Sequence, residues 1–173
     1  VEAAHDRSDR DTEVLGDRPA QLTGNQLLST LFGAQLHYTG AEESHWGELE
    51  IAREAVTDDL TAAGAAPYAI PIGGSTPVGA VGYAVAFVEL MEQFQRVGIA
   101  PAAIVFTSSS GGTHAGLVAG RALWRERGNA VPEVLAIGVA KGVNMGMPDI
   151  RDLARATLAL LDADPSIIER EDV

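Results

Sequence analysis

The sequence predicts an α/β fold built on a parallel sheet with helices on both faces. Short apolar segments alternate along the chain with longer helical patterns. The apolar segments are hydrophobic nearly throughout, which is typical of parallel strands buried on both faces. In such a sheet, the loops at the carboxyl ends of the strands are where ligands bind.

The first part of the chain is expected to hold two helices and two strands. Its polar lead-in, up to about residue 22, carries no predicted element. The elements are a helix over 24–33, a strand over 35–39, an amphipathic helix over 42–63 and a strand over 68–72. Gly33 ends the first helix and Gly64 follows the second, as expected for residues that adopt the left-handed conformation at a helix end.

The second part continues the alternation. It is predicted to hold a helix over 77–96, a strand over 103–107, a helix over 113–127, a strand over 134–139 and a helix over 148–161. Pro77 suits the first position of a helix. The run AAGAAP at 62–67 interrupts the pattern, so we expect a boundary there that divides the chain into 1–64 and 65–173.

Composition excludes several classes of function. The net charge of −12 disfavours a nucleic-acid partner. No apolar run approaches the roughly 18 residues of a membrane span, and the polar start is unlike a secretory signal, so a cytoplasmic location is expected. The chain has no cysteine, and His37 and His45 lack metal-ligand spacing, so we expect no metal site.

One loop carries the clearest chemical signal. The strand over 103–107 runs directly into three serines, two glycines and a threonine, and a helical pattern follows at once. Backbone amides freed by the turn, the positive end of the helix dipole and the hydroxyls together predict an anion site, most simply for phosphate. The predicted ligands are Ser108, Ser109, Ser110, Gly111, Gly112 and Thr113. No Lys or Arg lies between Thr107 and Gly120, which excludes a G-x-x-x-x-G-K-[ST] loop.

Other interpretations of these residues remain open. The serines also suit a polar turn that satisfies local backbone groups, whereas a serine nucleophile is disfavoured because no glycine precedes them as in G-x-S-x-G. Gly73-Gly74-Ser75 is either a simple turn or a second backbone cradle. His114 is either a solvated residue at the helix start or a base beside the anion.

Five segments, in this order and spacing, resemble one family of enzymes. They are Gly24 to Leu28, Leu31 to Ala34, Pro67 to Ser75, Gly79 to Tyr83 and Ser108 to Gly116. The series is similar to the pyridoxal-phosphate enzymes that include 1-aminocyclopropane-1-carboxylate deaminase and D-cysteine desulfhydrase, of the tryptophan synthase β-like fold type II. The resemblance covers roughly residues 24–162.

The resemblance implies a two-lobed enzyme with pyridoxal phosphate as its cofactor. Residues 1–64 would belong to the smaller lobe and 65–173 to the larger, with Ser108–Thr113 gripping the cofactor phosphate. Thr23-Gly24-Asn25 would start a helix near the substrate. The activity would be that of a lyase or deaminase converting a small amino acid to ammonia and a 2-oxo acid, commonly in a homodimer.

The chain also departs from the family's pattern. The family's Schiff-base lysine lies upstream in an Asn-Lys segment that this sequence does not show, and its one lysine, Lys141, follows the strand over 134–139. Active-site tyrosines of the family belong to a later half that is missing after Leu161. We therefore expect a central fragment with no catalytic residue of its own. The alternative is a non-catalytic α/β module that binds a phosphorylated ligand through Ser108–Thr113.

Overall fold

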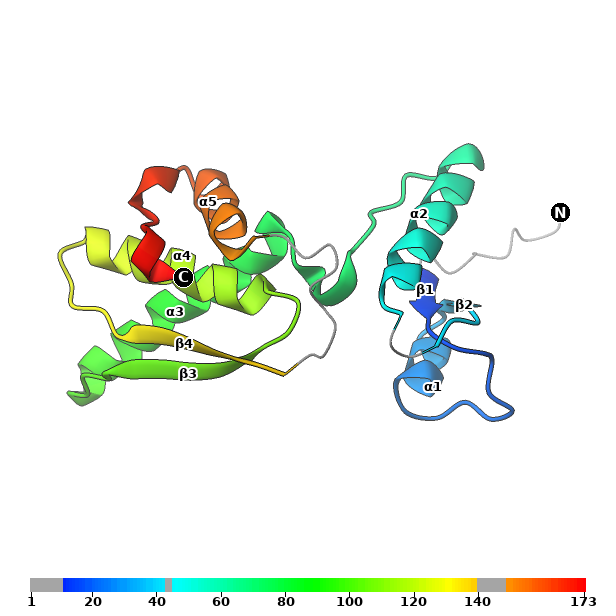
Figure 1. Cartoon of the computed structure of the whole chain (residues 1–173), viewed down its shortest axis with the longest axis horizontal. Helices are drawn as coiled ribbons and strands as arrows, with labels where there is room; N and C mark the ends of the chain where they lie inside the picture. Colours follow the sequence, from blue (N-terminus) through cyan, green and yellow to red (C-terminus); the bar gives the residue numbers. More distant parts are fainter. Residues whose placement is uncertain (1–10, 43–44, 140–148) are drawn as a thin grey trace, which may run out of the picture. The chain divides into compact units, whose positions relative to one another are not determined.

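The computed structural model describes residues 11–42, 45–139 and 149–173. Two separately packed units divide the chain, one ending at Ile70 and the other beginning at Pro71 (Figure 1). The α/β class with parallel strands is confirmed, since both pairs of strands in the described residues are parallel. The assignment of 1–64 and 65–173 to the lobes of a larger enzyme stays a prediction.

The first unit is a small parallel ribbon with two helices. Its elements are β1 (Asp11–Val14), α1 (Gly24–Leu31), β2 (Gln35–Tyr38) and α2 (Gly47–Ala62). The strands pair from Asp11↔Gln35 to Val14↔Tyr38, and α1 lies between them in sequence, as a parallel connection requires. Gly64 follows α2 at φ +85°, and the Ala65 N–H returns to the Leu60 carbonyl at 3.0 Å. The predicted helix end at Gly64 is therefore confirmed.

Two expectations for the first part of the chain were wrong. β1 lies in the stretch expected to be a polar lead-in. The predicted strand over 68–72 is not a strand, because a strand needs a neighbour to bond with, and in the described residues none pairs with this segment. Tyr68 and Ile70 are instead 73% and 65% exposed, and Ile72–Gly74 forms a 3₁₀ turn.

The second unit holds most of the predicted alternation. Its elements are α3 (Pro77–Val97), β3 (Ala103–Ser108), α4 (Gly112–Glu126), β4 (Glu133–Gly138) and α5 (Ile150–Leu160), followed by 3₁₀ turns at Pro165–Ile167 and Arg170–Asp172. The Thr76 hydroxyl caps α3 by accepting the Gly79 N–H at 3.1 Å, with Pro77 at the first helical position as predicted. Gly98 ends the helix in the left-handed conformation.

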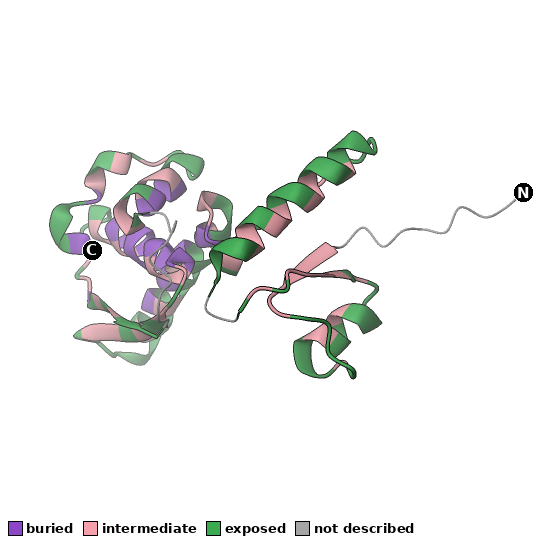
Figure 2. Ribbon diagram, turned by 45° about the vertical axis from the view of Figure 1, so that its right-hand side comes forward, coloured by how far each residue is buried: buried purple, intermediate pink, exposed green. Residues whose placement is uncertain are grey.

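Small residues let α3 and α4 approach closely. A Cβ added at Gly120 would lie 2.6 Å from the Ala84 carbonyl oxygen and from the Phe87 Cβ, and one at Gly116 would meet Ala80 and Tyr83. Glycine at these two positions therefore sets the separation of the helices. α5 joins the same core, with Leu153 and Leu158 packed against apolar residues of α4. Figure 2 shows the buried residues gathered in this unit.

The sequence predicts helices on both faces of the sheet. Among the described residues, helices cover one face of the β3–β4 sheet. Ile104, Phe106 and Val134 pack with the core of α3 and α4. The alternate residues are exposed, with Val105 at 63% and Ile137 at 54%. The pleat of the strands places these two sets on opposite faces of the β3–β4 sheet.

Candidate functional site

Two loops meet at the start of α4. The Ser75 Oγ, from the turn before α3, accepts the Gly112 N–H at 3.1 Å, and the Ser75 side chain is buried. Gly73 lies so near the second loop that an added Cβ would run into the Ser110 side chain. The predicted anion loop is thus held against the Gly73–Ser75 segment, which the sequence alone did not join to it.

The first turn of α4 presents backbone amides without intrahelical partners. The first bond inside the helix runs from the Ala115 N–H to the Gly111 carbonyl at 2.9 Å. The amides of Gly112, Thr113 and His114 therefore precede it, and Ser75 takes the first of them. The Thr113 and His114 amides remain at the positive end of the helix dipole, and no acidic residue lies in this turn.

The hydroxyl groups of the loop add further donors. Ser109, Ser110 and Thr113 follow one another around the turn, and within the described part of the chain no hydrogen bond engages their side chains. The left-handed Gly111, at φ +93°, turns the chain between the two serines and α4. Donors without acceptors, gathered at a helix start, fit an anion such as phosphate. The structure places the predicted ligand residues together between the end of β3 and the first turn of α4. Their role as ligands stays a prediction.

His114 occupies the first turn of α4 without adding positive charge. Its half-buried ring meets the Phe106 ring edge-on, with centroids 5.5 Å apart. Burial lowers the pKa of His114 below its ordinary value of 6.5. The imidazole is therefore neutral at neutral pH, so an anion at this loop would be held by amides, hydroxyls and the dipole.

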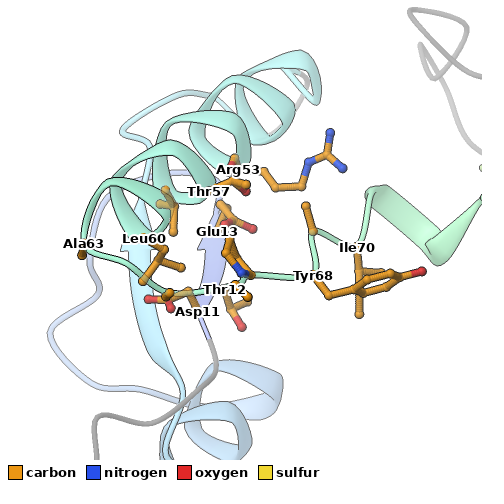
Figure 3. A pocket seen from close by; sticks show the side chains of 14 residues that line it. Asp11, Thr12, Glu13, Arg53, Thr57, Leu60, Ala63, Tyr68 and Ile70 are labelled. Carbon is orange, nitrogen blue, oxygen red and sulfur yellow. Dashed lines mark hydrogen bonds between the residues drawn. The ribbon is translucent and has the colours of Figure 1, made fainter.

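A separate groove of about 830 Å³ lies within the first unit (Figure 3). It is lined by β1, by one side of α2 and by residues 63–70. Arg53, the cationic side chain in its wall, is paired with Glu50 one turn earlier on α2. Asp11 is likewise engaged, at 2.7 Å from His37. No residue of the predicted anion loop lines this groove.

Three further expectations from the sequence concern Lys141, metal binding and membrane spans. Lys141 falls outside the described residues. Within 11–42, 45–139 and 149–173, no cluster of three or more His, Cys, Asp or Glu could hold a metal ion. Over the same residues, no helix combines the length and hydropathy needed to cross a membrane.

Known proteins resemble this chain in both sequence and structure. A protein of Pyrococcus furiosus that is named as a 1-aminocyclopropane-1-carboxylate deaminase is 38% identical to this chain over 139 residues. These residues make up 79% of this chain and 40% of that protein. The D-cysteine desulfhydrase of Serratia proteamaculans is 35% identical over 82% of this chain and 40% of its own length. The crystal structure of an ACC deaminase homologue superposes with a TM-score of 0.67 at 29% identity, over 88% of this chain and 43% of that one.

The chain thus spans about two fifths of the length of these relatives. The family described as pyridoxal-phosphate dependent enzymes matches residues 12–159, which span most of both units and include the loop at α4. Pyridoxal phosphate carries a phosphate group, which is the kind of anion predicted for this loop. The fold, the loop and the extent of the match lead to one conclusion: the chain belongs to the family of pyridoxal-phosphate dependent enzymes.

Proposed function

We propose that this chain forms the phosphate-binding core of a pyridoxal-phosphate dependent lyase or deaminase. The observation that carries the proposal is the Ser108–Thr113 loop at the start of α4, in a chain whose family uses this cofactor. The names of the relatives favour a small amino acid as substrate, D-cysteine or 1-aminocyclopropane-1-carboxylate. Ammonia and a 2-oxo acid would be the products, with sulfide in addition from D-cysteine.

Each part of the loop has a distinct task in this proposal. The Thr113 and His114 amides would donate to the phosphate oxygens, and Ser109, Ser110 and Thr113 would add their hydroxyls. Gly111 and Gly112, both buried, keep side chains out of the turn. The cofactor, when bound, supplies an electron sink for the substrate carbanion. The residues of this chain hold and orient its phosphate.

The proposal assigns no catalytic base to the described residues. Lys141 is the one lysine of the sequence, and the family resemblance places the Schiff-base lysine elsewhere. We therefore propose that the chain binds the cofactor without turnover and that the lysine belongs to a segment that this sequence does not include. Residues 1–64 and 65–173 would be parts of the smaller and larger lobes. A cytoplasmic homodimer belongs to the same proposal.

The test is a titration of the purified chain with pyridoxal phosphate, followed by its absorbance and fluorescence. Saturable binding that inorganic phosphate competes away is expected, with no stable lysine adduct after borohydride reduction. Failure to saturate would contradict the phosphate grip. Labelling of Lys141 together with turnover would contradict the assignment of the lysine to another segment.

A second candidate function rests on the same loop and on the absence of the family's Schiff-base lysine from this sequence. The chain would then be a non-catalytic α/β module for a different phosphorylated ligand. Flanking coding sequence separates the two, because an upstream Asn-Lys segment in the same reading frame supports the enzyme. A start codon directly before Val1 would support the module.

A further inference from the structure

We infer that Ser75 is a positioning residue that sets the affinity of the α4 loop for the cofactor phosphate. This inference rests on the proposed function and extends it to a residue outside the Ser108–Thr113 loop. The bond from the Gly112 N–H to the Ser75 Oγ joins positions 37 residues apart in sequence. It fixes the first amide of α4 relative to the start of α3.

The segment that presents Ser75 is itself firmly held. The Gly74 N–H bonds to the Pro71 carbonyl and the Thr76 N–H to the Gly74 carbonyl, both at 2.8 Å. Directly after it, the capped start of α3 lies against the turn, since a Cβ at Gly79 would run into the Gly74 carbonyl oxygen. Ser75 therefore sits on a backbone that cannot shift without disturbing a helix start.

α4 is fixed at a second point, one turn further along. Gly116 approaches the α3 backbone so closely that a Cβ there would meet the Ala80 carbonyl oxygen. This contact sets the distance between the helices, whereas the Ser75 bond sets the direction of the first turn. Because the Thr113 and His114 amides follow Gly112 in that turn, their direction depends on Ser75 as well.

The Ser75 hydroxyl also has a proton available to donate to a ligand. Its oxygen accepts from Gly112, and among the described residues its proton has no acceptor, although the residue is only 8% exposed. A buried hydroxyl proton without an acceptor is costly, and a bound anion would relieve that cost. Donation to the hydroxyl oxygen also polarises the O–H bond, which strengthens such an interaction.

The decisive comparison uses two ligands that differ only in the phosphate. Ser75→Ala is expected to weaken pyridoxal phosphate binding roughly threefold to thirtyfold while leaving pyridoxal binding unchanged, because one hydrogen bond has a modest net effect. Ser75→Thr keeps the hydroxyl and should restore the affinity. Amide exchange at Gly112, measured without ligand, should accelerate in Ser75→Ala and return towards the wild-type rate in Ser75→Thr.

Thr157→Val is the matched control. Thr157 is also buried, and its hydroxyl bonds at 2.7 Å to the Leu153 carbonyl of its own helix, away from the α4 loop. This variant should lose stability with no change in affinity for pyridoxal phosphate. If Ser75→Ala does not fold, Ser75→Cys keeps the shape of the side chain, slightly enlarged, with a weaker acceptor and should show the same selective loss.

The outcomes separate this inference from the function on which it rests. Equal affinities of wild type and Ser75→Ala for pyridoxal phosphate would overturn the role of Ser75 and leave the loop's function intact. Equal weakening of pyridoxal and pyridoxal phosphate would also overturn it, by showing a general structural effect. If the wild-type chain binds no pyridoxal phosphate, the proposed function fails and this inference fails with it.

Discussion

Asp172 accepts a hydrogen bond at 2.7 Å from Arg125, 47 residues earlier in the chain. The carboxylate is buried and also meets Arg121, while a second Arg125 nitrogen donates to the Ile167 carbonyl at 2.6 Å. The hydrogen bond to Asp172 raises the pKa of Arg125. This cluster fastens the last residues of the chain onto α4.

Asp172→Asn is expected to destabilise the second unit by about 1–3 kcal/mol, because two arginines lose their counter-charge at a buried position. Urea denaturation followed by circular dichroism measures the loss. Glu171→Gln, at the exposed neighbouring position, is the control and should change the stability little. Equal effects of the two changes would show that the cluster adds no specific stability.

Gly120→Ala is expected to cost about 1–3 kcal/mol, because its Cβ would overlap α3. The control is Gly82→Ala on α3, where an added Cβ meets nothing within 4 Å and helix propensity should give about 0.5–1 kcal/mol of stabilisation. Thermal denaturation of both variants gives the comparison. A Gly120→Ala protein as stable as the wild type would contradict the close approach of α3 and α4.

Gly73→Ala tests the contact between the two loops at the site. Gly73 and Gly98 have φ of +68° and +71°, so alanine should strain either position by about 1–2 kcal/mol. Only at Gly73 would the Cβ meet Ser110, since the space around Gly98 is open. We therefore expect both variants to lose stability and Gly73→Ala alone to weaken pyridoxal phosphate binding. Equal affinities in the two variants would rule out coupling between these loops.

His114 should make stability depend on pH. Its pKa is lowered on folding, so the unfolded chain binds the proton more readily. The stabilisation is therefore complete above the ordinary value of 6.5 and is lost as the pH falls through the lowered value. Denaturation curves recorded between pH 7.5 and 5.5 give the free energy of unfolding at each pH. This free energy should fall more steeply with decreasing pH in the wild type than in His114→Asn. Equal slopes for the wild type and His114→Asn would contradict this account.

Much of the second unit was predictable because its patterns are local. The helix predicted over 77–96 is observed at Pro77–Val97, and the strand predicted over 134–139 at Glu133–Gly138. The start of α4 could be found because hydroxyls and glycines follow an apolar strand directly. These features depend on residues that are neighbours in sequence.

Features that depend on distant partners could not be found in this way. β1 has the sequence Asp-Thr-Glu-Val, which is too polar to indicate a strand until β2 lies beside it. The segment 68–72 has the composition of a strand, yet no described strand pairs with it. The bond between Ser75 and Gly112 spans 37 positions, and no pattern in a single sequence connects them.

The most direct test of the central claim is a titration of the isotope-labelled chain with pyridoxal phosphate, followed by amide ¹H–¹⁵N spectra. The proposal predicts that the amide signals of Ser109 to His114 shift in a saturable manner, that pyridoxal produces much smaller shifts, and that inorganic phosphate reproduces part of the effect. Shifts confined to residues lining the groove between β1 and α2, with the α4 loop unchanged, would contradict it.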